Sequence, residues 1–230
     1  ASTYVAEFSP DRSRGFWASM LNMGSYLGFA AGASVVAIST VSFGEDIMLD
    51  WGWRVPFLLA LPLGAVAIWF RMRIPETPSF EAAASTEDAY TDPRDPRVRH
   101  GLGGIVRYYW KAILIGIAIV AAEGTAGYAL TSYMPTYLEK EIGVSNLDAA
   151  VATIPVLVVM SLCLPFIGRL SDRIGRKPVY VIAVGSTLAL MVPAFAILQI
   201  GEEWAVFVAL SLVAIPVAFY VSMTASALPA

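Results

Sequence analysis

The sequence has few of the side chains on which most soluble proteins and metalloenzymes rely. Only 14% of its 230 residues are charged, whereas soluble globular domains carry about 25% charged residues. The single cysteine, Cys163, excludes a disulfide within the chain, and the single histidine, His100, leaves no ligand set for zinc or haem. The net charge of -3 provides no basic surface for a phosphate backbone. We therefore predict no metal or other cofactor, no enzyme activity and no nucleic-acid partner.

Apolar residues make up 57% of the chain and give it a mean hydropathy of +0.67. A helix needs about 20 mostly apolar residues to cross the hydrocarbon core of a bilayer. Ala1–Ala6 has the composition of the end of one span, and we expect the chain to be an internal piece of a longer protein. The predicted fold class is all-α, a polytopic transmembrane helical bundle with about seven spans. The six longer apolar runs are Phe16–Val41, Val55–Phe70, Ala112–Tyr133, Ala149–Ile167, Val179–Ile200 and Trp204–Pro229.

The loops between these runs alternate in charge. All Lys and Arg residues except Arg54 and Lys140 lie in the loops Glu7–Arg14, Arg71–Lys111 and Gly168–Pro178. Basic residues accumulate in cytoplasmic loops of membrane proteins. We therefore predict that these three loops face the cytoplasm. The short run at 55–70 counts as a span in this scheme because Trp51, Trp53 and Trp69 mark its ends, as an aromatic belt would.

The longest loop, at 71–111, predicts a division of the chain into two helical parts. It contains several prolines, including the repeat Asp92–Arg97 (DPRDPR), and few large apolar side chains. Such a composition does not bury a core. We predict an amino-terminal helical half at 1–70, a cytoplasmic linker at 71–111 and a carboxy-terminal helical half at 112–230. His100 lies in the linker and is expected to be solvated.

The most specific local pattern is the loop Gly168–Pro178 (GRLSDRIGRKP). A cytoplasmic loop is expected to be basic, but that expectation does not explain the spacing of its glycines, aspartate and arginines. The loop resembles the signature loop of the major facilitator superfamily, between helices 8 and 9 of that fold. Further segments are similar to the proline/betaine transporters within the metabolite:proton symporters of this superfamily. They are Tyr4–Gly15, Asp50–Phe57, Ala60–Gly64, Glu76–Phe80 and Tyr133–Leu138.

The resemblance implies a partial major facilitator fold, from the end of helix 4 through helix 10. It implies a proton-coupled symporter that imports a small zwitterionic osmolyte such as proline or glycine betaine by alternating access, in the bacterial cytoplasmic membrane. The expected partners are the solute, a proton and the lipid bilayer, with no obligate protein partner. Two alternatives stay open: transport of an organic acid such as 2-oxoglutarate or shikimate, and a non-transporting assembly or sensor protein.

One ionisable residue, Glu123, lies well inside an apolar run. A carboxylate in the middle of a membrane is costly unless it faces a cavity or a partner, or is protonated. We predict that Glu123 binds a proton or the substrate, with a structural hydrogen-bonded glutamic acid as the alternative. The proline/betaine transporters resemble this chain but have a neutral polar residue there, which leaves a different substrate open.

Neutral polar side chains on two of the apolar runs are further candidates for the substrate site. Tyr128 is the main one, because it follows Glu123 by little more than one helical turn and its ring can hold a quaternary ammonium group. Hydrogen bonding between helices is the alternative role for each of them. The other candidates are Asn22, Ser25, Tyr26 and Ser132. In the same part of the chain, the stripe Gly24, Gly28 and Gly32 predicts close packing against another helix.

The signature loop is predicted to form part of a cytoplasmic latch. Asp172 would supply the acid, and Arg173 and Arg176 would be its cationic partners. The remaining loop residues assigned to this gate are Gly168, Gly175 and Lys177.

Overall fold

The computed structural model describes residues 4–5, 8–73 and 101–227, and the described residues contain no strand. The longer helices are α2 (Arg14–Phe43), α4 (Arg54–Arg73), α6 (Gly101–Tyr128), α8 (Asn146–Ile174), α9 (Arg176–Leu198) and α10 (Glu203–Ala227). Short helical segments are η1 (Asp11–Ser13), α3 (Glu45–Ile47), η2 (Met48–Gly52), η3 (Ala129–Tyr133), α7 (Met134–Tyr137) and η4 (Leu138–Ile142). Six helices in this part of the chain are long and apolar enough to cross a membrane. The all-α bundle is confirmed, while Ala1–Ala6 lies largely outside the described residues.

The predicted spans coincide with helices, and every helix begins before its apolar run, although α9 ends at Leu198, just before the predicted Ile200. The largest difference is at α6, which begins at Gly101 rather than at Ala112 and therefore includes the end of the predicted linker. Tyr109 has non-helical backbone angles (φ -111°, ψ 15°) and separates this first segment from the span, which runs as one helix over Tyr109–Ile142. Residues 74–100, which hold the DPRDPR repeat and His100, lie outside the described part.

The continuous helix formed by α6, η3, α7 and η4 contains a π-helical turn next to Pro135. Pro135 has no N–H to donate, and its ring crowds the carbonyl group four residues earlier. The wider π-helical turn η3, at Ala129–Tyr133, directly precedes it. Gly143, with φ of 80°, ends η4, and Ser145 then begins α8 by accepting a hydrogen bond from the backbone N–H of Asp148 at 3.1 Å.

Aromatic residues mark both ends of α4, as the sequence predicts. Arg54 stacks over Trp53 at 4.5 Å, and Arg73 stacks over Trp69 at 4.8 Å. The 20 residues of α4 span about 30 Å, which is the thickness of the hydrocarbon core. No residue of α4 is buried, and its main contact within the described part of the chain is with α2.

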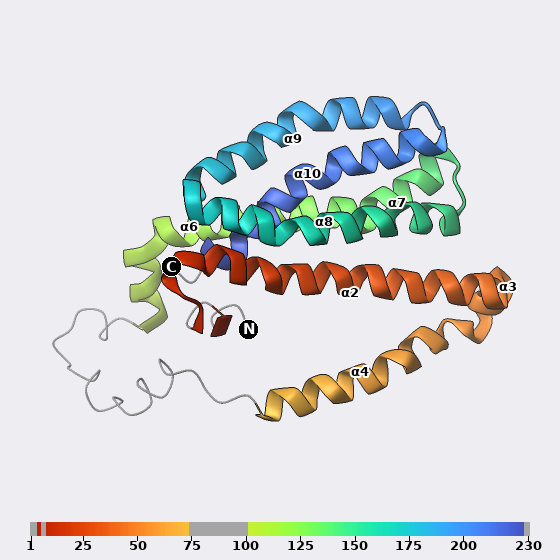
Figure 1. The fold of residues 1–230 in the computed structure, drawn as a ribbon, viewed down its shortest axis with the longest axis horizontal. Coiled ribbons are helices and arrows are strands. Elements are labelled where there is room, and N and C mark those ends of the chain that lie inside the picture. Colours follow the sequence, from red (N-terminus) through yellow and green to blue (C-terminus); the bar gives the residue numbers. More distant parts are fainter. Residues whose placement is uncertain (1–3, 6–7, 74–100, 228–230) are drawn as a thin grey trace.

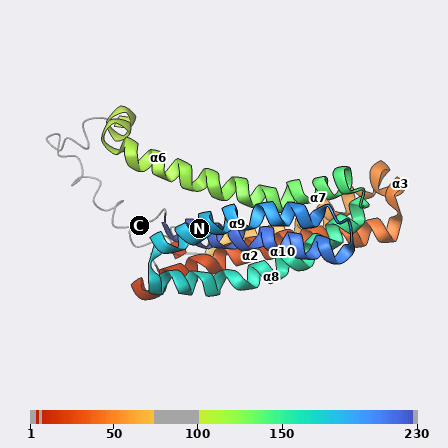
Figure 2. The ribbon, with the colours of Figure 1, turned by 90° about the horizontal axis from the view of Figure 1, so that it is seen from above.

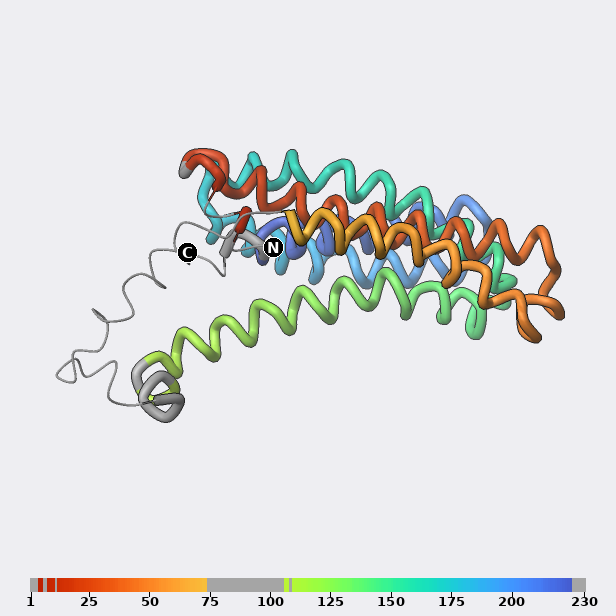
Figure 3. The backbone as a smooth tube through the Cα atoms, turned by 90° about the horizontal axis from the view of Figure 1, so that it is seen from below, coloured from red at the N-terminus to blue at the C-terminus, as the bar shows by residue number. Residues whose placement is uncertain are grey.

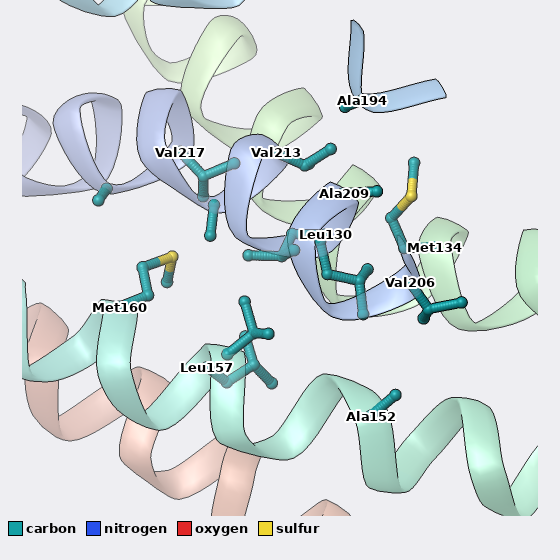
Figure 4. Close-up of a cluster of buried hydrophobic side chains, with 14 of the residues drawn as sticks. Leu130, Met134, Ala152, Leu157, Met160, Ala194, Val206, Ala209, Val213 and Val217 are labelled. Atoms are coloured by element: carbon teal, nitrogen blue, oxygen red, sulfur yellow. The ribbon is translucent and has the colours of Figure 1, made fainter. Parts of the chain in front are cut away.

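The core of the bundle is built around α10. One face of α10 presents Val206, Leu210, Val213, Val217 and Val221, a spacing of three and four residues that keeps them in line. They pack against α8, α9 and the segment η3–α7, mainly through Leu130, Met134, Leu157, Met160 and Ala194 (Figure 4). Such contacts rest on close van der Waals fit, because lipid tails are as apolar as the side chains themselves.

α2 runs alongside α8 for much of its length, α10 packs against both of them, and α9 packs mainly against α10 (Figures 1 and 2). α2 and α8 are antiparallel, so the amino terminus of α2 lies beside the carboxyl end of α8. α6 crosses the bundle, close to it near α7 and separated from it toward its own amino terminus (Figures 2 and 3). We call the end where α8 meets α9 the signature-loop end.

Candidate functional site

At the signature-loop end, Asp172 joins the two parts of the chain. Its Oδ1 accepts a hydrogen bond from the backbone N–H of Gly15 at 2.8 Å, and its Oδ2 accepts one from the N–H of Phe16 at 3.0 Å. These two N–H groups belong to the first turn of α2, where no partner exists within the helix. A carboxylate there also interacts favourably with the positive end of the helix dipole. Asp172 therefore acts as an N-terminal cap supplied by another helix.

Two glycines allow α2 and α8 to approach closely beside this cap. A Cβ atom on Gly15 would lie 2.6 Å from Asp172 Oδ1 and 2.7 Å from the carbonyl oxygen of Gly168. A Cβ atom on Gly168 would collide with the Ser19 hydroxyl and the Gly15 carbonyl oxygen. Gly168, which the sequence analysis assigns to the gating loop, thus permits a close helix crossing. The other loop glycine, Gly175, has φ of 89° and ends α8. Its N–H donates to the backbone carbonyl oxygen of Ser171.

The partners of Asp172 differ from those that the sequence suggests. Its carboxylate binds backbone N–H groups of α2, and the described residues show no ion pair between it and Arg173 or Arg176. The reason is geometric, because the close glycine contact places the start of α2 directly against the carboxylate. Arg173 is instead exposed, as is Lys177, while Arg176 is the first residue of α9.

A second group of polar side chains ties α2 to α8 and α10. The amide of Asn22 donates to the carbonyl oxygen of Val221, and the hydroxyl of Ser222 donates to the carbonyl oxygen of Leu164 at 3.0 Å. Ser19, fully buried, donates to Gly15 at 2.6 Å and approaches the Ser222 carbonyl at 3.4 Å. Polar side chains within a membrane seek such partners on neighbouring helices. Asn22 therefore has a structural bond in this arrangement.

Farther along the bundle, Glu123 of α6 lies in a polar cluster formed by four helices. Glu123 is partly buried, and the side chain of Thr224 on α10 lies near its carboxylate. Tyr26 of α2 lies near the same carboxylate, with its hydroxyl against α6: a Cβ atom on Gly127 would be only 2.8 Å from it. The buried hydroxyl of Tyr180 on α9 faces Thr224 without a hydrogen bond of ordinary geometry.

This cluster has the chemistry of a site that binds a proton or a small polar solute. It combines one carboxylate with three hydroxyl groups and two aromatic rings, all within membrane-spanning helices. The hydroxyl of Thr224 donates a hydrogen bond to the backbone carbonyl oxygen of Tyr220 at 3.2 Å, so its position is fixed by α10 itself. We name Glu123, Tyr26, Thr224 and Tyr180 the Glu123 cluster.

Four of the six predicted substrate residues are not brought to the Glu123 cluster: Asn22, which bonds to Val221 instead, and three exposed residues. Tyr128 is 71% exposed, and Ser132 and Ser25 are exposed as well. Ser25 bonds only to Leu21 in its own helix, at 3.3 Å. The glycine stripe also differs from expectation, because Gly24, Gly28 and Gly32 have no neighbouring atom within 4 Å of an added Cβ among the described residues.

The structure adds residues that the sequence analysis did not select. These residues are polar side chains within the predicted apolar runs: Thr224, Tyr180, Ser19 and Ser222. Hydroxyl residues are common in membrane helices, however, and their spacing alone does not show which helix they face. No group of three or more His, Cys, Asp or Glu side chains suited to a metal ion occurs within residues 8–73 and 101–227 or at 4–5.

Comparisons with known proteins agree with the fold. The family model described as Major Facilitator Superfamily matches residues 1–230. The chain is 60% identical to the "Ectoine/proline transporter ProP" of Corynebacterium glutamicum, an alignment that covers 100% of the chain and 47% of that protein. It is 38% identical to the "Glycine betaine/proline/ectoine/pipecolic acid transporter OusA" of Dickeya dadantii, with 100% of the chain and 46% of the relative covered.

A third relative, the "Proline/betaine transporter" of Escherichia coli, is 35% identical over 100% of the chain and 46% of its own length. The chain thus spans about half the length of the curated relatives it matches. No solved structure gives a significant match. The predicted resemblance is confirmed, and with its membrane-spanning helices the protein is an integral membrane protein. The chain belongs to the Major Facilitator Superfamily.

Proposed function

We propose that the full-length protein imports a small zwitterionic osmolyte together with a proton. The observation that carries this proposal is the Glu123 cluster, in which a carboxylate inside the membrane meets hydroxyl groups from three other helices. A carboxylate at such depth is expensive and is typically found on ion or substrate pathways. The relatives are named for proline, betaine and ectoine, and we extend that class of solute to this protein.

The cluster suits coupling because it joins elements that lie on opposite sides of the predicted linker. Tyr26 belongs to α2, in the first half, whereas Glu123, Tyr180 and Thr224 belong to the second half. In alternating access, two helical halves move against each other around a central site. Protonation of Glu123 would change its interaction with Tyr26, and this interaction joins the two halves.

A zwitterionic solute fits the cluster better than an anion. Glu123 in its charged form attracts the nitrogen end of the solute, and the rings of Tyr26 and Tyr180 can face a quaternary ammonium group. The same carboxylate would repel a dicarboxylate. Transport of 2-oxoglutarate would therefore require Glu123 to act only as a proton carrier.

The contact between α8 and the start of α2 at Asp172, Gly15 and Gly168, which we call the signature-loop junction, provides the gate in this mechanism. In the orientation that the basic loops predict, the junction lies at the cytoplasmic side. The cap of Asp172 on α2 and the glycine contact at Gly15 and Gly168 hold the two halves together there. Opening toward the cytoplasm requires these contacts to break.

Proton-driven uptake into proteoliposomes tests the proposal. The full-length protein is supplied with labelled proline, glycine betaine or 2-oxoglutarate under an imposed pH gradient, with and without a protonophore. One proton that moves down a gradient of one pH unit sustains at most about tenfold accumulation of solute. We expect accumulation of proline or betaine that the protonophore abolishes. Uptake of 2-oxoglutarate alone would change the solute class, and a lack of any uptake would favour an assembly or sensor role.

Replacement of one glutamate separates coupling from binding. In Glu123→Gln, we expect solute exchange down its own gradient to continue while accumulation driven by the pH gradient disappears. Glu141→Gln is the matched control, because Glu141 lies on the same continuous helix and is exposed. If Glu123→Gln accumulates solute to the wild-type level at equal protein content, Glu123 is not the coupling residue.

A further inference from the structure

A cavity of about 700 Å³ opens beside the signature-loop junction. Its walls come from η1 and the start of α2 on one side and from the end of α8 on the other. The lining residues are Arg12, Ser13, Phe16, Trp17, Arg169, Asp172 and Arg173. The cavity thus spans the contact between the two halves of the chain, and it is separate from the Glu123 cluster.

The described wall of this cavity carries more positive than negative charge. Arg12, Arg169 and Arg173 are exposed, and none of them makes an ion pair or a hydrogen bond with another described residue. Among the wall residues that the structure describes, Asp172 is the one acid, and its two oxygens already accept N–H groups from Gly15 and Phe16. Three arginines therefore line one space, and the one carboxylate among its described lining residues is already engaged.

The shape and position of the cavity suit a molecule with a charged head and an apolar tail. Phe16 and Trp17 form an aromatic wall, with their rings in edge contact at 5.6 Å. Trp17 is 45% exposed and lies one turn into the membrane helix, which is the level at which tryptophan occurs in membrane proteins. Arginine forms paired hydrogen bonds with phosphate oxygens. Basic pockets between helices on the cytoplasmic side are suited to anionic lipid headgroups.

We propose that this cavity binds the phosphate of an anionic phospholipid headgroup and that the bound lipid holds α2 and α8 together. The phosphate bridges Arg12 of η1 to Arg169 and Arg173 of α8, while the acyl chains lie against Phe16 and Trp17. Because the three arginines converge only while the signature-loop junction is closed, the lipid favours the closed arrangement. The consequence for transport rests on the proposed function, whereas lipid binding does not.

Lipid binding is tested on the full-length protein by native mass spectrometry in detergent. Dioctanoyl phosphatidylglycerol is compared with dioctanoyl phosphatidylcholine, and inorganic phosphate and glycerol 3-phosphate serve as competitors. The test variant carries Arg12→Gln and Arg169→Gln, and the control carries Arg71→Gln, which removes a basic residue of α4 outside the cavity. Near an anionic membrane surface each basic residue contributes to the free energy of lipid binding. The loss of two arginines should therefore lower the affinity for phosphatidylglycerol by about tenfold or more.

We expect the double variant to lose phosphatidylglycerol and the control to keep it, with little binding of phosphatidylcholine to either. Equal phosphatidylglycerol binding by the double variant and the control would overturn the site. Displacement of the lipid by inorganic phosphate or glycerol 3-phosphate at similar concentration would show a free anion site and overturn the assignment to lipid. Neither result depends on transport, so failure here leaves the proposed function untouched.

Hydrogen exchange tests the effect on the junction. The backbone N–H groups of Gly15 and Phe16 are bound by Asp172, so their exchange reports how often the junction opens. We expect slower exchange of this segment in phosphatidylglycerol nanodiscs than in phosphatidylcholine nanodiscs, and no such difference in the double variant. Exchange that is the same in both lipids for the wild-type protein would contradict the proposed closure.

Discussion

At Gly168, the absence of a side chain decides how closely α2 and α8 can approach. A methyl group there would overlap the Ser19 hydroxyl and the carbonyl oxygen of Gly15. The latter is backbone, so it cannot move without shifting α2. The same crossing carries the cap of Asp172, and a displaced α2 would carry its first N–H groups away from that carboxylate.

We therefore expect Gly168→Ala to lower the free energy of unfolding by about 1 to 3 kcal/mol, as overpacked sites do. Gly185→Ala is the matched control, because Gly185 lies within α9 and an added Cβ there has no neighbour within 4 Å. Unfolding of the full-length protein in mixed micelles, titrated with a denaturing detergent, provides the comparison. An equal effect of the two substitutions would show that the crossing tolerates a methyl group.

Among the helices, α10 has the central structural role. It packs on α8, α9, α6 and α2, and it receives the hydrogen bond from Asn22 at Val221. Its buried face follows a regular spacing, but the helix is apolar on nearly every side, so the sequence alone does not show which face meets which partner. Polar bonds such as that of Asn22 therefore help to fix the position of α2 relative to α10.

Asn22→Ala should weaken this contact by about 0.6 to 1.7 kcal/mol, from the average to the largest value typical of hydrogen bonds between membrane helices. Ser25→Ala is the control, since Ser25 lies on the same helix but bonds only to its own backbone at Leu21. The two variants are compared by detergent-induced unfolding. A loss for Ser25→Ala as large as that for Asn22→Ala would argue against a specific bond between α2 and α10.

The spans themselves could be predicted because a helix in lipid must be long and apolar, and loops between spans carry the charges. Their exact ends could not. α8 extends to Ile174 although its apolar run ends near Ile167, because Arg169, Asp172 and Arg173 lie in a further helical turn outside the hydrocarbon. The start of α6 at Gly101 was missed for a related reason: a helix of mixed polarity outside the membrane has no apolar run to mark it.

The Glu123 cluster was predictable only in part. Glu123 is conspicuous because a charge stands out in an apolar run, whereas Thr224 lies about 100 residues farther along the chain and is an ordinary polar residue by type. Tyr128 was selected for its position relative to Glu123 along one helix, yet Tyr26, from another helix, is the tyrosine near the carboxylate. Contacts between helices depend on their rotation about their own axes, and the spacing of one helix does not fix the rotation of its neighbour.

For the molecule as a whole, the closed signature-loop junction corresponds to one of the two arrangements that the proposed alternating-access mechanism requires. The contacts that close it are few: one carboxylate on two N–H groups, one glycine crossing and a small set of hydroxyl bonds. Loss of one of them changes the balance between closed and open arrangements without removing the Glu123 cluster. Hydrogen bonds to a charged group contribute about 1.5 to 3 kcal/mol, enough to shift a two-state equilibrium by tenfold or more.

Asp172→Asn should therefore shift the protein toward opening at the signature-loop end while solute binding persists. The reporter is Ser171→Cys in a background with Cys163→Ser, because Ser171 is only 4% exposed beside the junction. We expect a membrane-impermeant maleimide, applied to inside-out vesicles, to label this cysteine about tenfold faster in Asp172→Asn, as the expected shift in population requires. Asp148→Asn, which makes the same change at the start of α8, is the control and should label at the rate of the parent. Equal labelling of Asp172→Asn and the parent would mean that the cap on α2 does not hold the junction closed, and that the glycine crossing and the hydroxyl bonds suffice.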